Sequence, residues 1–189
     1  MSKKYELVVD DTITFWGWKL FRIKALISFG SVDAGDFGGY IHTEDNLSQG
    51  GDAWVSGNAK VWGNAEVWGN AEVCGNAKVW GDAEVCGNAE VSGDAEVCGN
   101  AKVWGDAEVC GNAKVSDLGD VIVFKNHWSS GRHFTYTKSN KMWKVGCFYG
   151  TGQELIDKAY QDSDKSGNYY KAYVEFVEKL EALDESERP

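Results

Sequence analysis

Residues 51–116 read GDAWVS GNAKVW GNAEVW GNAEVC GNAKVW GDAEVC GNAEVS GDAEVC GNAKVW GDAEVC GNAKVS, which is eleven unbroken copies of one hexapeptide. Each copy is Gly, then Asn or Asp, then Ala, a variable residue, Val and a second variable residue. A period of six is far shorter than that of the common helical repeats, which have about 33 residues or more, and it is typical of a parallel β-helix.

The positions of Ala and Val explain this architecture. The two residues are two apart, so in an extended segment their side chains point to the same face, which we expect to be the interior. Gly followed by Asn or Asp tolerates left-handed backbone dihedrals, so one corner falls in each hexapeptide. Three sides of one hexapeptide each close a triangular coil of about 18 residues. The eleven copies then make about 3.7 coils, stacked about 4.8 Å apart.

A β-helix this short exposes apolar side chains and unpaired backbone at both ends unless the flanking segments cap it. The sequence therefore predicts a mainly β protein in three parts. Residues 1–50 form an N-terminal β cap and a first irregular coil, residues 51–120 form the β-helix, and residues 121–189 form a small α+β unit.

The repeat resembles the hexapeptide-repeat superfamily of left-handed parallel β-helices. Its signature is an aliphatic residue followed four positions later by a small one, as Val61 is followed by Ala65 and Val79 by Ala83. The resemblance implies the left hand of the helix, because the period alone does not determine handedness.

A second resemblance concerns the segment before the repeat. Residues 20–54, LFRIKALISFGSVDAGDFGGYIHTEDNLSQGGDAW, are similar to the corresponding segment of uncharacterised transferase-like hexapeptide proteins of enteric and gut bacteria and their phages. That likeness implies no activity. Ile41 and Leu47 fall in the Ala register of the hexapeptides, and we expect them to begin the first irregular coil.

The cysteines favour a reducing compartment. Cys74, Cys86, Cys98 and Cys110 recur in every second hexapeptide, so successive ones lie on different sides of the coil. Cys74 and Cys110 share a side but lie two coils apart, about 9.6 Å, which is too far for a disulfide. The same spacing argues against a metal cluster, and we expect no metal and no cofactor. With no long apolar run and no leader at Met1, a cytoplasmic protein without a membrane span is predicted.

The outward tryptophans suggest an interface. Folding the repeat into three sides places Trp62 and Trp80 on one side, and Trp68 and Trp104 on another. Outward rings on a flat face are normally covered, either by another chain or by flanking segments that fold back. Members of the superfamily commonly assemble through such sides, so the resemblance implies a homo-oligomer, a trimer or a dimer, with these four rings at its surface.

Acyltransferases on this fold rely on a His as general base, with acyl-coenzyme A lying along the helix. The eleven hexapeptides contain no His, because His42 precedes them and His127 and His133 follow. A coenzyme-A-dependent acyltransferase would need a base from a flank. Enzyme activity is left open, and a non-catalytic role is favoured.

Residues 121–153 hold five cations and no acid, although the formal charge of the whole chain is −10. The window is also rich in aromatic residues, and the alternation in HFTYT and KMWKVGCFYG predicts a small antiparallel sheet. Thr151 and Glu154 fit a capping box for one helix. Tyr170, Val174 and Val177 belong to the inward stripe of a second helix.

Rings beside cations suit a nucleotide-type anion, because rings stack on bases and cations bind phosphates. Arg132 ranks first, since its guanidinium is bidentate and lies in a Ser-Ser-Gly-Arg-His turn. The candidate ligand-binding residues are Ser129, Ser130, Arg132, His133, Lys138 and Lys141, with Trp128, Tyr136 and Trp143 as stacking surfaces. The alternative is that the rings form a core and the cations pair with acids elsewhere. Overall acidity argues against long nucleic acid.

Three functions of different classes remain. The first is a non-catalytic oligomeric scaffold that presents the C-terminal unit for multivalent binding. The likeness to phage and gut-bacterial proteins implies, for this scaffold, an anti-defence role: sequestration of a nucleotide immune signal, or inhibition of a host protein. The second is the acyltransferase. The third is a purely structural or polymer-forming β-helix, against which the two capping flanks argue.

Overall fold

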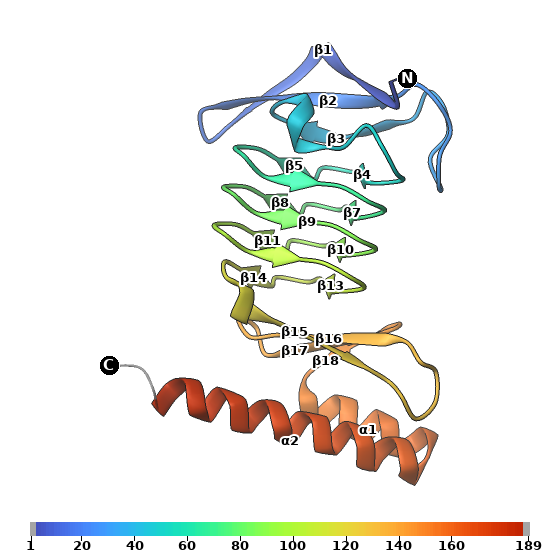
Figure 1. Ribbon diagram of the computed structural model, residues 1–189, viewed down its shortest axis with the longest axis vertical. Helices are drawn as coiled ribbons and strands as arrows, with labels where there is room; N and C mark the ends of the chain where they lie inside the picture. The colour runs from blue at the N-terminus through green and yellow to red at the C-terminus, as the bar shows by residue number, and fades with distance from the viewer. Residues whose placement is uncertain (1–2, 187–189) are drawn as a thin grey trace.

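The computed structural model describes residues 3–186 and is an elongated stack with the β-helix in its middle (Figure 1). Its coils are made of eleven two-residue strands, one in each hexapeptide, and each coil carries three of them. They are β4 (Trp54–Val55), β5 (Lys60–Val61), β6 (Glu66–Val67), β7 (Glu72–Val73), β8 (Lys78–Val79), β9 (Glu84–Val85), β10 (Glu90–Val91), β11 (Glu96–Val97), β12 (Lys102–Val103), β13 (Glu108–Val109) and β14 (Lys114–Val115). The predicted fold class, a mainly β protein with stacked parallel-strand coils, is confirmed.

The strands stack into three parallel faces, each in the register that a coil of three hexapeptides requires, for example Val61 against Val79. We name each face by one outward residue. The Trp62 face holds β5, β8, β11 and β14; the Cys74 face holds β4, β7, β10 and β13; the Trp104 face holds β6, β9 and β12. The Trp104 face is thus one strand shorter than the Cys74 face.

The interior is a column of Ala and Val with almost no exposed surface. The glycine at each corner has a positive φ, and a corner with a coil below it leaves little room for a side chain: a Cβ on Gly87 would lie 2.9 Å from the backbone N of Gly105. Side-chain amides join the corners of successive coils, as Asn88 does by donating to Asp106 at 2.9 Å.

The N-terminal cap extends the Trp62 face upward. Strands β1 (Tyr5–Phe15), β2 (Trp18–Ala25) and β3 (Phe37–Ile41) pair in antiparallel order, and β3 then runs parallel to β5. Ile41 pairs with Val61 and Leu47 with Val67, so both occupy Val positions and not the Ala positions predicted. Leu47 and Val55 are eight residues apart where the repeat has six, and the corner between them absorbs the two extra residues.

Side chains close the upper edges of the other two faces. The ammonium group of Lys4 is buried, and it donates to the carbonyl of Ala53 above the Cys74 face at 2.8 Å. Burial lowers the pKa of Lys4 to about 8. The amide of Asn46, in the 3-10 turn Glu44–Asn46, donates to the carbonyl of Ala65 above the Trp104 face, also at 2.8 Å.

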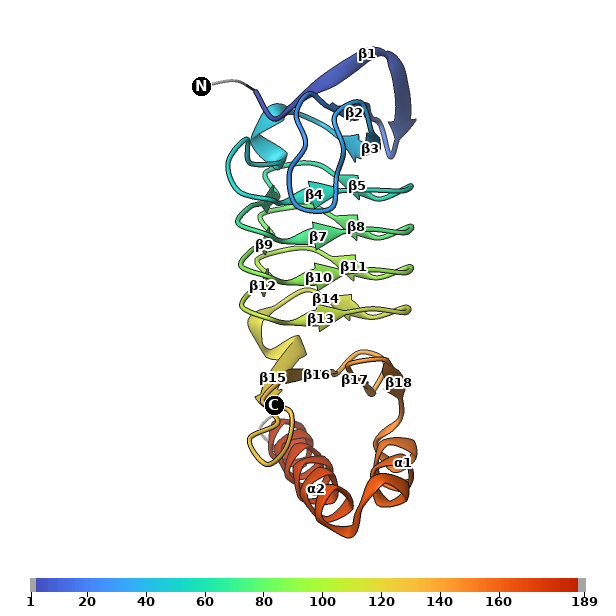
Figure 2. The same ribbon diagram turned by 90° about the vertical axis from the view of Figure 1, so that its right-hand side faces the viewer.

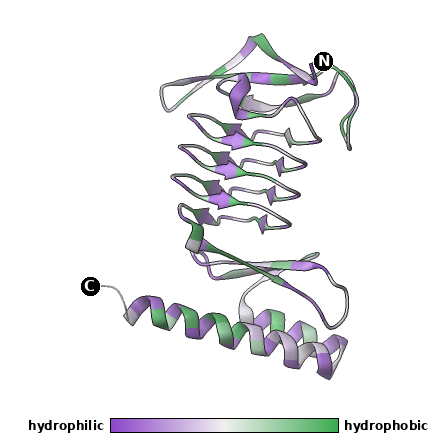
Figure 3. Ribbon diagram, in the orientation of Figure 1, coloured by the Kyte–Doolittle hydropathy of each residue, from purple (hydrophilic) through white to green (hydrophobic). Residues whose placement is uncertain are grey.

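The C-terminal unit begins after the 3-10 turn Leu118–Asp120. Its four strands form an antiparallel meander, and two helices cover one side of it (Figure 2). The elements are β15 (Val121–Lys125), β16 (His133–Thr137), β17 (Met142–Val145), β18 (Phe148–Gly150), α1 (Gly152–Asp162) and α2 (Asp164–Ser186). The predicted capping box of Thr151 and Glu154 is present at the start of α1. Hydrophobic and hydrophilic bands alternate along α2 (Figure 3), and its apolar side packs on the sheet.

Candidate binding site at the lower end of the β-helix

The rings predicted to stack on a ligand lie in the core of the C-terminal unit. The Trp143 side chain is 2% exposed and that of Tyr136 is 3% exposed, and both pack against Phe134 and the two helices. Trp128 is half-buried, with one face stacked on Tyr169 at a centroid separation of 4.7 Å. Burial and a hydrogen bond to Glu181 raise the pKa of Tyr136. The sequence-based alternative, in which these rings form a core, therefore describes the packing.

Three of the five cations in the acid-free window pair with acids from other parts of the chain. Lys138 pairs with Asp184 of α2, and Lys141 pairs with Glu181 of the same helix at 3.6 Å. Lys144 pairs with Glu108 of β13 at 2.9 Å. The segregated charges thus hold the sheet against the helix and against the lowest coil.

The remaining predicted site residues lie at the turn between β15 and β16. Ser129 bonds to the side-chain oxygen of Asn126, and the hydroxyl of Ser130 accepts from the backbone N–H of Arg132. Among residues 3–186, the Arg132 side chain has no ion pair. Ser130, Arg132 and His133 share a hollow of about 210 Å³. The structure therefore brings these three residues together, whereas Lys138 and Lys141 form ion pairs with acidic residues of α2.

The lower end of the β-helix depends on the hydroxyl groups of the C-terminal sheet. The N–H of Glu108, at the lower edge of the Cys74 face, donates to the hydroxyl of Thr135 at 3.0 Å. At the corner that follows, the hydroxyl of Tyr149 donates to the carbonyl of Cys110 at 3.4 Å. The N–H of Lys114, below the Trp62 face, donates to the hydroxyl of Ser139 at 2.7 Å. The lower edge of the Trp62 face is therefore capped within the chain. On the Cys74 face the N–H of Glu108 is capped, whereas the N–H groups of Cys110 and Asn112 have no protein acceptor within the described residues.

The lower edge of β12 has no such cap. In the coil above, the N–H groups of Glu84, Cys86 and Asn88 donate downward to the carbonyls of residues 101, 103 and 105. The equivalent N–H groups of Lys102, Trp104 and Asp106 have no protein acceptor within the described residues. A Cβ built on Gly105 would meet nothing within 4 Å, in contrast to Gly87. The chain departs here because the 3-10 turn Leu118–Asp120 carries β15 into the antiparallel sheet, away from the next position under β12.

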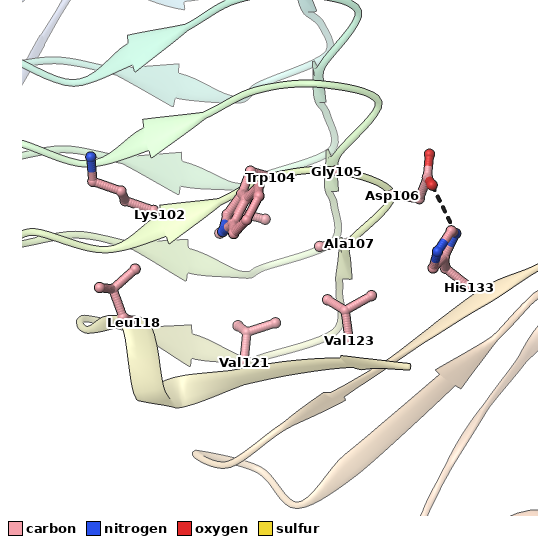
Figure 4. A pocket seen from close by; sticks show the side chains of 10 residues that line it. Lys102, Trp104, Gly105, Asp106, Ala107, Leu118, Val121, Val123 and His133 are labelled. Atoms are coloured by element: carbon pink, nitrogen blue, oxygen red, sulfur yellow. Dashed lines mark ion pairs between the residues drawn. The ribbon is translucent and has the colours of Figure 1, made fainter. Parts of the chain in front are cut away.

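A cleft of about 580 Å³ occupies the space below this edge (Figure 4). Its upper wall is the corner around Trp104, whose side chain is 66% exposed, and its lower wall carries Leu118, Val121 and Val123. Leu118 and Val123 are also exposed, so apolar side chains line both walls. The cleft combines unpaired main-chain groups with apolar surface.

His133 and Asp106 meet at one end of the cleft, with Nδ1 of the imidazole 2.8 Å from Oδ2 of the carboxylate (Figure 4). Asp106 is held by the N–H₂ group of Asn88 on its other oxygen. A carboxylate beside Nδ1 favours the tautomer with its proton there, which leaves Nε2 free to accept a proton. The pair can therefore hold the imidazole of His133 in the orientation of a general base, and it also joins the two walls at this end of the cleft.

Sequence reasoning placed His133 and Trp104 at functional surfaces, and missed Asp106, Leu118 and Val123. Asp106 looks like any other corner residue of the repeat. Residues 117–119 read DLG where the repeat has Gly-Asn-Ala, and this break was the available signal that the last coil remains open.

The two pairs of outward tryptophans have different surroundings. Trp62 is 2% exposed and stacks on Trp80 at 5.1 Å, and Trp16 at the β1–β2 turn packs edge-on against both rings. The rings of Trp62 and Trp80 are therefore covered within the chain. On the Trp104 face, Trp68 and Trp104 remain 44% and 66% exposed.

No protein-family model matches the chain, and no curated protein matches it significantly. The protein is a parallel β-helix of about four coils with a capping element at each end. In residues 3–186, no helix is both long enough and apolar enough to cross a membrane.

Proposed function

We propose that this protein is a non-catalytic scaffold whose cleft under β12 binds an extended segment of a partner protein. The observation that carries the proposal is the lower edge of β12, where none of the three downward N–H groups has a protein acceptor within the described residues, whereas each of the other lower edges has at least one capped N–H group. An unpaired strand edge is a template for another strand.

The chemistry of the cleft suits a polypeptide better than a small polar ligand. The N–H groups of Lys102, Trp104 and Asp106 belong to alternate residues and point the same way, which is the pattern that an added strand satisfies with its carbonyls. Leu118 and Val123 offer apolar contacts for alternate side chains of that strand. The volume of about 580 Å³ is within the usual range of ligand sites, about 300–1,000 Å³.

A nucleotide-type ligand stays a prediction with reduced support. Its predicted stacking surfaces Tyr136 and Trp143 are buried, and Lys138 and Lys141 are already paired with α2. Arg132 and the neighbouring Ser130 and His133 remain as a candidate phosphate contact. Of the two roles implied by the phage-type resemblance, binding to a host protein therefore has the better support.

Peptide selection tests this proposal. Extended peptides selected from a random displayed library against the whole protein should shift the amide NMR signals of Lys102, Trp104 and Asp106. Val123→Arg should weaken their binding at least about 10-fold, because the charged side chain would occupy the apolar wall. Leu183→Arg, a change at an exposed leucine of α2 outside the cleft, is the matched control. Selected peptides that bind Val123→Arg as tightly as the wild type would refute the proposal.

A second candidate function, a coenzyme-A-dependent acyltransferase with a flank His as base, is favoured by the His133–Asp106 pair beside the cleft. Together with this function, we infer that the chain is related to the hexapeptide-repeat superfamily. The register of three hexapeptides per coil supports this relationship. The test is a titration with coenzyme A followed by melting temperature. A melting temperature that stays unchanged at millimolar coenzyme A counts against this function. If coenzyme A raises the melting temperature of His133→Asn as much as that of the wild type, His133 does not contribute to coenzyme A binding.

The five free cysteines fit a reducing compartment, and this supports our placement of the protein in the cytoplasm.

A further inference from the structure

The Trp104 face presents two parallel columns of outward side chains. One column is Glu66, Glu84 and Lys102, which lie in β6, β9 and β12, and the other is Trp68, Cys86 and Trp104, which directly follow these strands. Successive members of a column are one coil apart, about 4.8 Å. The small Cys86 therefore lies between two exposed rings, about 9.6 Å apart.

The charges of this face are incompletely matched within the chain. Lys102 donates to Glu84 at 2.7 Å, which raises the pKa of Lys102. Glu66, at the other end of the column, is exposed and has no ion pair among residues 3–186. The face thus has an unmatched acid at its upper end and a cation at its lower end.

We infer that a second copy of this chain docks on the Trp104 face in antiparallel orientation, with a two-fold axis lying along β9. This axis exchanges the upper and lower ends of each column, so Glu66 of one copy faces Lys102 of the other. The same rotation sets Trp68 against Trp104 of the other copy, on both sides of the central Cys86. Each copy therefore supplies a cation opposite the unpaired Glu66 and a ring opposite Trp68 of the other. The axis also places Glu84 opposite Glu84 of the other copy, and each of these carboxylates keeps its bond to Lys102 of its own chain.

The alternative two-fold arrangement is disfavoured by the same pattern. An axis along the β-helix would keep the copies parallel and exchange the two columns. Glu66 would then press against the ring of Trp68, and Glu84 against Cys86, with no cation opposite either acid. Only the antiparallel arrangement pairs opposite charges and stacks ring on ring.

The contact is small, so the association is weak. Three strands of two residues each bury less than the roughly 1,200 Å² typical of stable complexes, and we expect a dissociation constant of about 10–100 μM. The docking face shares Lys102 and Trp104 with the cleft of the proposed partner, but dimerisation is measured without a peptide, so failure of either proposal is distinguishable from failure of the other.

Charge exchange combined with analytical ultracentrifugation tests the arrangement on the full chain. The wild type should reach a monomer–dimer equilibrium at concentrations up to about 0.5 mM. Glu66→Lys and Lys102→Glu should each raise the dissociation constant at least about 10-fold, because each replaces two attractive contacts with two repulsive ones. The double variant should return to within about 3-fold of the wild type, and an equimolar mixture of the two single variants should form mixed dimers.

Two further variants separate the face from general surface effects. Glu72→Lys reverses an outward charge of β7 on the Cys74 face and should leave the dissociation constant unchanged. Trp68→Ala should abolish the dimer while circular dichroism shows a folded chain. A monomer throughout the concentration range, a trimer, or a folded double variant that fails to dimerise would each overturn the inference.

Discussion

At the scale of the residue, single hydroxyl groups replace the missing coil at the lower end of the β-helix. Thr135 is buried, and its oxygen accepts the hydrogen bond from the N–H of Glu108 that a strand of a further coil would otherwise take. A buried backbone donor left without a partner loses its hydration with nothing in return. The side chains of the C-terminal sheet are therefore part of the β-helix in energetic terms.

Thr135→Val tests this directly, because the substitution keeps the shape of the side chain and removes the acceptor. We expect the free energy of unfolding to fall by about 1–3 kcal/mol, the penalty of one unsatisfied buried donor. Urea denaturation followed by circular dichroism measures it. Thr12→Val, at a half-buried threonine of β1 in the opposite cap, is the control. An equal loss in both variants would mean that the hydrogen bond to Glu108 contributes nothing of its own.

The outward cysteines predict a pH dependence at alkaline pH. Burial raises the pKa of the Cys74 and Cys110 thiols from 9.0 to about 11 in each case. In the unfolded chain these thiols ionise first, so above pH 9 the unfolded state binds fewer protons than the folded state. The free energy of unfolding therefore falls from about pH 9 to about pH 11, by roughly 1 kcal/mol per thiol after allowance for partial exposure.

Urea denaturation at about pH 8 and about pH 10.5 measures the loss, and the variant with both Cys74→Ser and Cys110→Ser should lose less. Lys4 acts in the opposite sense over part of this range, because its lowered pKa makes the folded state gain stability as the pH rises above 8. Its contribution is the same in both proteins and cancels in the comparison. Cys147→Ser, at an exposed thiol of the C-terminal unit, should behave like the wild type.

At the scale of the element, β9 and β12 differ in a way that hydrogen exchange can measure. The downward N–H groups of β9 and its corner are bonded to the coil below, whereas those of β12 have no protein acceptor in the described residues. We expect the amides of Lys102, Trp104 and Asp106 to exchange at least about 100-fold faster than those of Glu84, Cys86 and Asn88. Exchange followed by NMR resolves the six amides. Equal protection would mean that the edge of β12 is closed in solution, and the proposed peptide site would fail with it.

The elements that could be predicted are those with local signals. The coil, its corners and its three outward columns follow from a period of six, and the capping box at Thr151 follows from a four-residue pattern. The predicted register of Ile41, at an Ala position of the repeat, was wrong because two extra residues before Ala53 shift the register, and no local signal marks such an insertion.

Contacts between distant segments account for what the sequence did not predict. Trp16 covers Trp62 and Trp80 from a turn that lies far before them in the chain, and nothing in the outward pattern of the repeat distinguishes these rings from Trp104. In the same way, an alternating strand such as HFTYT does not reveal which of its faces will meet the helices. Tyr136 therefore looked as suitable for a ligand as for a core. The candidate cleft depends on one such event, the departure of the chain at the 3-10 turn Leu118–Asp120.

At the scale of the whole molecule, the two caps decide whether a β-helix stays a particle of defined length. Repeat proteins need terminal units that end the stack, because every coil offers its neighbour the same edge. The upper cap provides partners on all three edges, and the C-terminal unit caps the lower edge of the Trp62 face and the N–H of Glu108 on the Cys74 face. Among the described residues, the lower end therefore offers only the N–H groups of β12 and those of Cys110 and Asn112 to another coil, which argues against a polymer-forming β-helix, because so short an edge gives little contact for end-to-end growth.

Removal of the lower cap should release that growth. A chain of residues 1–120 leaves the downward N–H groups of Glu108 and Lys114 without Thr135 and Ser139, so the lower edges of all three faces become open. We expect this chain to form assemblies larger than dimers that lengthen with concentration, as seen by sedimentation velocity and electron microscopy. A chain that lacks only residues 187–189 is the control and should sediment like the full chain. If the chain of residues 1–120 stays folded and monomeric, open edges are tolerated in this β-helix, and the uncapped edge of β12 would no longer distinguish a binding site.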